Sequence, residues 1–260
     1  MPLYRAREAA LIGEAMGAQP VRRWLDAGCG DGRFAKLLDA AAPEIPVPVG
    51  VDADEHRLAR ASRVRAHCYL VRADLGRLPF ADGSYDVVVC NSVLEHMDDP
   101  DAALREFARI LAVGGSLLLT VPNCTFEDLL LGSRLLRALR MPALAARHSQ
   151  HLSRYMRHFH YWEVDALASR ACAHALILQS HVPYASRFLC STGSLLYLAR
   201  IAGLGGSRYS LLPETELRRR PIVRALRDIA IALEAWLIRG EAESGRTGPF
   251  GCAFIVFRRG

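Results

Sequence analysis

Short apolar runs alternate with segments of helical spacing over the first half of the chain. The run from Tyr85 to Cys90 is strongly apolar, as strands buried on both faces of a parallel sheet are. The segment from Asp101 to Leu111 instead places apolar side chains every three or four positions, as an amphipathic helix does. This alternation predicts parallel strands that are joined by crossover helices.

The same pattern predicts five strands and three helices before Pro122. We expect strands at 21–25, 46–51, 68–72, 85–90 and 116–121, and helices at 31–41, 55–65 and 101–111. An Asp-Gly pair at 82–83 marks a turn before the fourth strand, and a Gly-Gly pair at 114–115 ends the third helix.

The alternation of predicted strands and helices ends after Pro122. Two helical patterns lead into an aromatic and histidine-rich stretch, which is followed by a further helix and strand. Late in the chain, two more helical patterns precede a last strand. The segments concerned are 129–139, 143–148, 163–174, 175–182, 195–201, 222–238 and 252–258. The chain therefore combines an α/β unit with additional helical segments.

Composition indicates an ordinary globular protein of 260 residues, 51% of them hydrophobic and 23% charged. No apolar run approaches the roughly 20 residues that span a bilayer. The N-terminal residues mix charged and apolar side chains, so we expect neither a signal peptide nor an anchor there. The seven cysteines are widely spaced and odd in number, which favours reduced thiols and a cytoplasmic protein.

The most informative stretch runs from Trp24 to Gly32 and reads WLDAGCGDG. It leads from a predicted strand directly into a predicted helix. Glycines at such a junction let the backbone turn tightly and approach a ligand, and the helix start offers unpaired N–H groups. A dinucleotide-binding fingerprint would place its third glycine at position 33, where this chain has Arg33.

Asp52 closes the second predicted strand in the sequence VDAD. An acidic side chain at this point, soon after a glycine-rich loop, can accept hydrogen bonds from two ribose hydroxyls and would repel a 2′-phosphate. The alternative role of capping the next helix suits Asp54 better. The loop and Asp52 together predict a site for a nucleoside.

With Asp26 at the end of its strand, the glycine-rich stretch resembles the cofactor loop of class I S-adenosylmethionine-dependent methyltransferases. Further stretches extend the resemblance to Val121 in the right order: RADL at 72–75, YDVVVCNSVLEH at 85–96, and the helix, glycine turn and strand at 104–121. The Leu-Glu-His after the fourth strand is similar to the methyltransferase type 11-like subgroup, which acts on small molecules.

The resemblance implies a Rossmann-like, doubly wound α/β fold. Its sheet would have seven mostly parallel strands, with helices on both faces, an antiparallel last strand and helical insertions. The methyltransferase domain would comprise residues 1–182 and 249–260, with 123–162 as a cap segment and 183–248 as a helical insertion before the last strand.

The resemblance also implies S-adenosylmethionine as cofactor and a set of residues that bind it, with Asp74 at the adenine amino group and the loop after the fourth strand beneath the methionine part. The set is Asp26, Ala27, Gly28, Cys29, Gly30, Gly32, Asp52, Ala53, Asp74, Leu75, Asn91, Ser92 and Val93.

Methyl transfer needs an acceptor lone pair in line with the methyl group and its sulfur, and positioning alone supplies roughly 7–11 kcal/mol. A hydroxyl acceptor would also gain from a general base, for which histidine is the usual choice. His96, His158 and His160 are the candidates; for His96, bracing the loop is the alternative. The histidines at 148, 151, 158 and 160 do not reproduce a common zinc pattern, so we predict no metal site.

Positive charge suggests the kind of partner. The net charge is +6, and Lys36 is the only lysine, so arginine supplies nearly all of the positive side chains. Between Leu129 and Trp162 there is no acid but there are six arginines: Arg134, Arg137, Arg140, Arg147, Arg154 and Arg157. Such a cap could attract an anionic acceptor or lipid surface, or could be a solvated face in an arginine-rich protein. The apolar insertion suits a packed helical subdomain, with a lid, a homodimer interface or peripheral membrane contact as the alternatives.

We therefore expect an enzyme that methylates a small molecule, on oxygen, with a glycan, lipid-linked or polyketide-like acceptor. Two alternatives stay open: a non-catalytic scaffold that binds the cofactor and a protein partner, and an RNA methyltransferase. The sequence NSVL at 91–94 lacks the Asn/Asp-Pro-Pro-aromatic motif of base methylation, which argues against nucleic acid. A nicotinamide-dependent oxidoreductase is disfavoured by the glycine spacing.

Overall fold

Seven strands form one sheet in a computed structural model that describes residues 2–186, 190 and 249–260. The strands are β1 (Trp24–Ala27), β2 (Val49–Asp52), β3 (Tyr69–Arg72), β4 (Tyr85–Asn91), β5 (Leu111–Pro122), β6 (Leu176–Ser186) and β7 (Phe250–Arg259). Their order is β3-β2-β1-β4-β5-β7-β6, parallel from β3 to β5, with β7 antiparallel to both of its neighbours. The predicted Rossmann-like fold with an antiparallel last strand is confirmed.

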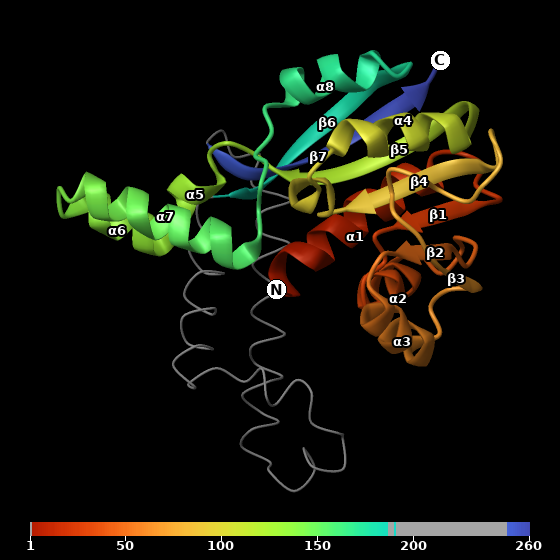
Figure 1. The fold of residues 1–260 in the computed structure, drawn as a ribbon, viewed down its shortest axis with the longest axis horizontal. Coiled ribbons are helices and arrows are strands. Elements are labelled where there is room, and N and C mark those ends of the chain that lie inside the picture. Colours follow the sequence, from red (N-terminus) through yellow and green to blue (C-terminus); the bar gives the residue numbers. More distant parts are fainter. Residues whose placement is uncertain (1, 187–189, 191–248) are drawn as a thin grey trace, which may run out of the picture.

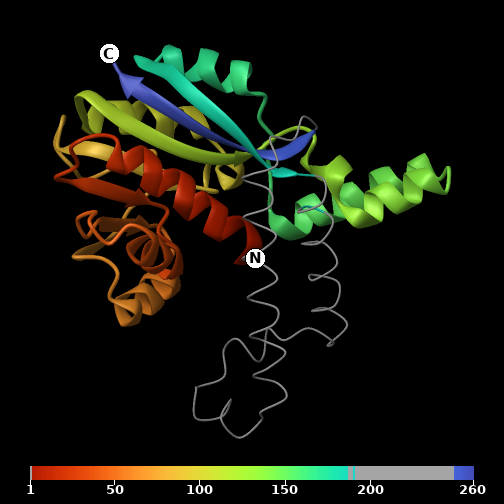
Figure 2. The ribbon, with the colours of Figure 1, turned by 180° about the vertical axis from the view of Figure 1, so that it is seen from behind.

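Helices cover both faces of the sheet (Figures 1 and 2). The helices near the sheet are α1 (Pro2–Gly17), α2 (Arg33–Ala41), α3 (Glu55–Val64), α4 (Pro100–Ile110) and α8 (Val164–Cys172), together with the short 3-10 helix η1 (Leu94–His96). One face packs against α1 and α2, and the other against α4 and α8. The crossover helices therefore lie where a doubly wound sheet requires them.

Strand β4 shows why the central strands are apolar throughout. Val87 and Val89 pack into the core beneath α1, whereas Val88 and Cys90 pack into the core beneath α4. All four side chains are at most 1% exposed. Because successive side chains of a strand point to opposite faces, a strand buried on both faces has no polar side.

The cap segment extends beyond the end of β5 as α5 (Phe126–Leu129), α6 (Leu131–Ala138) and α7 (Pro142–Met156), and projects from the sheet in Figure 1. The two ends of the cap segment lie side by side, and the backbone N–H of Trp162 donates to the carbonyl of Pro122 at 3.1 Å. The sequence pattern predicts two helices here, and α7 is longer than expected.

Several boundaries differ from the prediction. Strand β5 begins at Leu111, before the glycine pair, because Leu111 pairs with Tyr85 ahead of a register shift. Strand β6 continues to Ser186 along β7. The predicted insertion at 183–248 otherwise lies outside the described residues, apart from Cys190. No helix in the described part of the chain is long and apolar enough to cross a membrane.

Candidate functional site

The glycine loop between β1 and α2 is held against the end of β2. Gly28, Gly30 and Gly32 all have positive φ, at 78°, 58° and 77°, which L-residues with a side chain adopt only with strain. The N–H groups of Gly28 and Cys29 both donate to the carbonyl of Val51 at 2.8 Å. The backbone of the loop is therefore fixed by β2 rather than by its own side chains.

Asp52 sits at the end of β2 and is 7% exposed. Its Oδ2 accepts from the N–H of Gly30 at 2.9 Å, and its Oδ1 accepts from the N–H of Asp54 at 2.9 Å. Each carboxylate oxygen has a second lone pair with which it can accept from a ligand. The structure thus brings the glycine loop and the acidic strand end into direct contact.

The loop is packed on two sides and open on a third. A Cβ atom on Gly28 would lie 2.5 Å from a methyl of Val93, and one on Gly32 would lie 3.2 Å from Ala61. A Cβ on Gly30 would meet nothing within 4 Å. Helix α2 starts after Gly32, which has no side chain to cap it, and the N–H of Arg33 donates to Oδ1 of Asp31 at 3.3 Å. The next N–H groups of the first turn have no partner within the helix and can bind an anion or a polar ligand.

Three further expected residues lie at the end of β1 and in the loop itself: Asp26, Ala27 and Cys29. Ala27 and Cys29 are buried, and burial raises the pKa of the Cys29 thiol, which therefore stays protonated. The carboxylate of Asp26 is also buried, and its Oδ2 lies 2.8 Å from Nε2 of the buried His67. Asp26 thus ties β1 to the residues that precede β3.

Neighbouring strand ends carry the other expected residues. Ala53 and Asp74 are exposed beside the ends of β2 and β3, and Oδ1 of Asp74 accepts from the N–H of Gly76 at 2.7 Å. Leu75 is buried in the core. Past β4, Ser92 has a φ of 50° and its N–H donates to Thr120, while Val93 covers Gly28.

Asn91 belongs to a buried polar network that the sequence did not predict. At its centre is Glu8 of α1, which is 2% exposed. Glu8 accepts from Arg5 at 2.9 Å, from Asn91 at 3.1 Å and from the Tyr184 hydroxyl at 2.8 Å. Arg5 also donates to Ser92 Oγ at 3.3 Å. Helix α1 therefore supports the end of β4 from one face.

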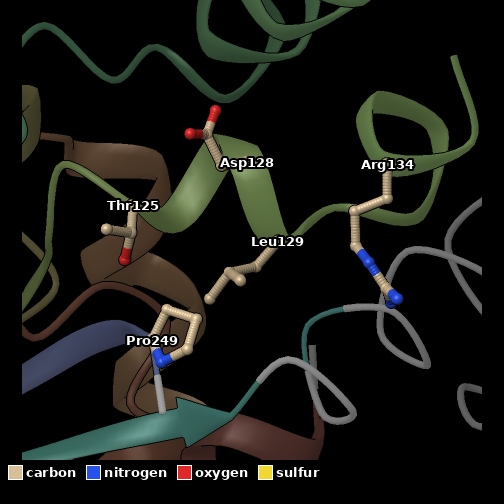
Figure 3. Close-up of a pocket in the computed structure, with 5 residues that line it drawn as sticks. All are labelled: Thr125, Asp128, Leu129, Arg134 and Pro249. Carbon is tan, nitrogen blue, oxygen red and sulfur yellow. The ribbon is translucent and has the colours of Figure 1, made fainter. Parts of the chain in front are cut away.

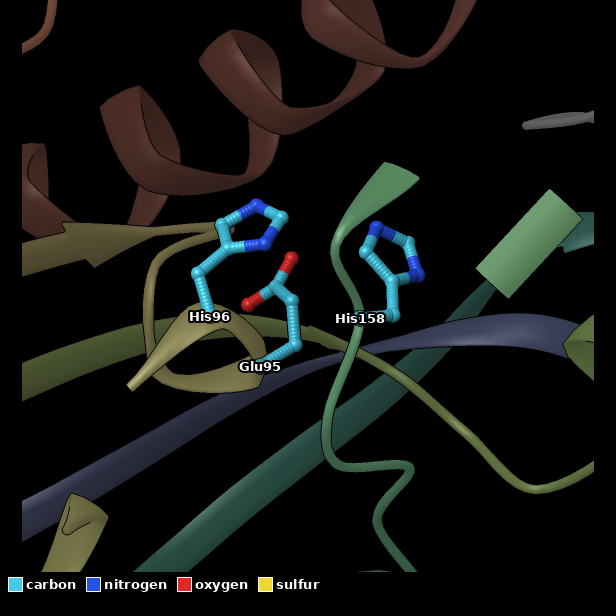
Figure 4. A group of neighbouring side chains, drawn as sticks. All are labelled: Glu95, His96 and His158. Atoms are coloured by element: carbon cyan, nitrogen blue, oxygen red, sulfur yellow. The ribbon is translucent and has the colours of Figure 1, made fainter. Parts of the chain in front are cut away.

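Two of the three candidate catalytic histidines meet near the end of β4. His96 follows Glu95 in η1, and its ring centre lies 5.1 Å from that of His158, which follows α7. His160 points elsewhere: its Nε2 donates to the carbonyl of Met97 at 2.9 Å, and its ring lies beside Trp162. Glu95, which is not among the residues predicted from the sequence, lies between the two imidazole rings (Figure 4).

Burial sets the ionisation of this group. Desolvation raises the pKa of Glu95 to about 8, because burial penalises the carboxylate. Desolvation, with His96 adding to it, lowers the pKa of His158 to about 4, and desolvation also lowers the pKa of His96. Both imidazole rings are therefore neutral at neutral pH, and each has a nitrogen lone pair.

A surface hollow of about 230 Å³ lies on the cap side of the molecule (Figure 3). It is lined by Thr125, Asp128, Leu129, Arg134 and Pro249. None of these residues comes from the glycine loop or the end of β2. The hollow thus adjoins the cap segment and is separate from the loop that Asp52 contacts.

Comparison with known proteins agrees with this geometry. Residues 25–119 match the family described as methyltransferase domain. A protein of Mycobacterium tuberculosis named as a probable S-adenosylmethionine-dependent methyltransferase is 37% identical over 99 residues, which are 38% of this chain and 35% of the relative. Demethylmenaquinone methyltransferase of Renibacterium salmoninarum is 32% identical over 149 residues, covering 56% of this chain and 61% of that protein.

A solved structure shows the same fold. Phosphoethanolamine N-methyltransferase 2 of Haemonchus contortus, in complex with S-adenosyl-L-methionine, superposes with a TM-score of 0.58 at 19% identity and covers 97% of this chain and 52% of that one. The matched part of the chain spans about a third of the length of the mycobacterial relative.

Proposed function

Because the chain carries a class I S-adenosylmethionine-dependent methyltransferase domain, we propose that it transfers a methyl group from S-adenosylmethionine to a small-molecule acceptor. One observation carries this proposal above the others. The glycine loop at the end of β1 touches the carboxylate of Asp52 at the end of β2, and the space over Gly30 is open. This arrangement suits a nucleoside whose ribose hydroxyls reach Asp52 while the rest of the molecule passes over bare backbone.

In the proposed complex, each strand end holds one part of the cofactor. The remaining lone pairs of Asp52 accept from the ribose hydroxyls, and Asp74 accepts from the adenine amino group above Leu75. Asn91, Ser92 and Val93 lie beneath the methionine part. Asp26 supports the loop without contacting the cofactor in this proposal, because its carboxylate is paired with His67.

The transfer itself is an in-line displacement: the acceptor atom forms its bond to the methyl carbon as the bond from carbon to sulfur breaks. We propose oxygen as the acceptor atom. The imidazole rings of His96 and His158, near the end of β4, would assist the loss of the hydroxyl proton. Glu95, His96 and His158 supply the polar groups there. Positioning of the two reactants can lower the barrier of such a reaction by roughly 7–11 kcal/mol.

The cap favours an anionic or lipid-like acceptor. Its arginines are accompanied by exposed apolar side chains, listed here with their exposed fractions: Leu135 57%, Leu139 60%, Leu144 42%, Tyr155 62% and Phe159 58%. Exposed apolar side chains beside cations suit a ligand or membrane surface that has both an apolar part and a negative charge. One relative is named for acting on demethylmenaquinone, so small-molecule acceptors occur among similar proteins. A homodimer through the predicted insertion at 183–248 stays a prediction, because residues 187–189 and 191–248 lie outside the described part of the chain.

Calorimetry with S-adenosylhomocysteine, the product form of the cofactor, tests the proposal. We expect the protein to bind it and Asp52→Asn to weaken binding by about 10-fold or more, since a charged acceptor of two hydrogen bonds is lost. Asp39→Asn, an exposed substitution in α2, is the matched control and should bind as the wild type does. Absence of binding by the wild type would overturn the proposal. Binding without release of S-adenosylhomocysteine in the presence of lipid-like and anionic acceptors would favour the scaffold alternative.

A further inference from the structure

Glu95, His96 and His158 form a cluster of potential metal ligands. One ligand atom from each residue lies within 4.8 Å of the other two, and Figure 4 shows the carboxylate of Glu95 between the two rings. Within the described parts of the chain, no other three His, Cys, Asp or Glu side chains come together in this way. The cluster joins η1, directly after β4, to the segment that follows α7.

Backbone hydrogen bonds hold the two segments together. The N–H groups of Phe159 and His160 donate to the carbonyl of Glu95 at 2.7 and 3.4 Å. In the other direction, the rings of His96 and His160 bond to the carbonyls of Arg157 and Met97 at 2.8 and 2.9 Å. The three ligand residues are therefore placed by the fold rather than by mobile side chains alone.

The hydrogen bond of His96 also fixes which of its nitrogens is available. Because a carbonyl oxygen only accepts, Nδ1 of His96 must carry the proton that it shares with Arg157. Nε2 then has a free lone pair. Histidines that bind metals usually donate their other N–H to a carbonyl or carboxylate in this way, which orients the ring and raises its basicity.

Glu95 supplies an independent reason to expect a ligand. Its side chain is 2% exposed, and no described residue donates to its buried Oε2 atom. A buried carboxyl oxygen without a partner is costly, and an ion or bound molecule is one way of satisfying it.

We propose that Glu95, His96 and His158 bind one divalent transition-metal ion. Two imidazole nitrogens and one carboxylate oxygen are a ligand set of catalytic zinc and non-haem iron sites, whereas magnesium and calcium prefer oxygen alone. Ligand atoms at roughly 2.1 Å from a tetrahedral ion are about 3.4 Å apart, so atoms that now lie within 4.8 Å of one another need to approach by at most about 1.4 Å.

Three protein ligands leave open coordination positions beside the proposed methyl donor. An acceptor hydroxyl bound there would release its proton to solvent more easily, and its oxygen would then attack the methyl carbon. This role rests on the proposed function, but binding of the ion does not. This site differs from the sequence prediction of no metal. That prediction rested on the spacing of the histidines at 148, 151, 158 and 160 and did not include Glu95.

The test is direct metal binding by the full chain, freed of purification tags and of metal. We expect Zn²⁺ to bind in calorimetry and Co²⁺ to give a visible absorption spectrum typical of a protein-bound ion. Glu95→Gln and His96→Ala should each weaken Zn²⁺ binding by about 10-fold or more, and His96 is exposed, so its loss should leave the fold intact. The exposed His151 lies outside the cluster, and His151→Ala should bind as the wild type does.

Failure of the wild type to bind either ion would overturn the proposal, as would unchanged Zn²⁺ binding by both cluster variants. Calorimetry with S-adenosylhomocysteine on the same samples separates the two proposals. Intact binding of that compound without metal binding would reject only the metal site, and metal binding without it would reject only the proposed cofactor site.

Discussion

At the residue scale, Gly28 has two separate reasons to lack a side chain. Its φ is 78°, and a Cβ atom would lie 2.5 Å from Val93. We expect Gly28→Ala to lower the free energy of unfolding by about 2–4 kcal/mol, because left-handed strain and overpacking add together. It should also weaken binding of S-adenosylhomocysteine. Denaturant unfolding and calorimetry measure the two effects.

Gly17→Ala is the matched control for that substitution. Gly17 is exposed at the end of α1, and a Cβ there would meet nothing within 4 Å. We expect little change in either measurement. Equal losses of stability in the two variants would show that the packing of Val93 on Gly28 is not responsible.

At the scale of the element, α1 matters because it carries Glu8 into the core. Glu8 accepts hydrogen bonds from Arg5 and Asn91 on one oxygen and from Tyr184 on the other. In Glu8→Gln, the amide NH₂ group replaces one of the two oxygens. It then faces either the N–H donors of Arg5 and Asn91 or the hydroxyl of Tyr184, so at least one hydrogen bond loses its acceptor. Arg5 also loses the negative charge that it pairs with. We expect a loss of about 3 kcal/mol in the free energy of unfolding by urea. Glu14→Gln, an exposed change in the same helix, should be neutral within the error of the measurement.

Helix α1 was not among the predicted helices, and the role of its Glu8 was not predicted either. Ala9, Ile12 and Met16 have the spacing of one helical face and are at most 1% exposed, so a signal for the helix was present. The role of Glu8 had no such signal, since its partners Asn91 and Tyr184 are distant in sequence. A polar residue in a helix is ordinarily solvated, and only the fold shows that this one is buried.

At the scale of the whole molecule, Arg109 joins α4 to the chain between β3 and β4. It binds both carboxylate oxygens of Glu106 at 2.8 Å, and it donates to the carbonyls of Leu78 and Phe80. This hydrogen bonding lowers the pKa of Glu106 below its ordinary 4.5. A carboxyl group whose pKa is lowered by folding stabilises the protein above its unfolded pKa, and the effect disappears as the pH falls through the folded value.

We therefore expect Glu106→Gln to reduce the free energy of unfolding by about 1.5–3 kcal/mol at neutral pH. The difference from the wild type should shrink as the pH is lowered below 4.5. Urea unfolding over a series of pH values measures it, with the exposed Glu44→Gln as reference. A difference that stayed constant down to strong acid would contradict an ionic origin.

The sheet was predictable from the sequence because parallel strands buried on both faces leave continuous apolar runs, as β4 does. The loop at Gly28–Gly32 and the position of Asp52 were predictable because glycine spacing and strand ends are local features. The pairing of Leu111 with Tyr85 was not, since it depends on a register shift between two strands. Nor was the meeting of Glu95 with His158, which requires knowing where the chain returns after α7.

The hydrogen bond from the N–H of Trp162 to the carbonyl of Pro122 closes the neck of a loop that contains the whole cap. The cap also packs against the sheet, because Phe126, Leu129 and Leu130 belong to the same buried cluster as Val87 and Val89 of β4. Exchanging the segment between Pro122 and Trp162 would alter the proposed acceptor side, whereas the contact of Gly30 with Asp52 lies outside it. Chimeras joined at this neck that keep the packing of Phe126 and Leu129 and the hydrogen bonds to Glu95 are therefore a rational route to new acceptor preferences.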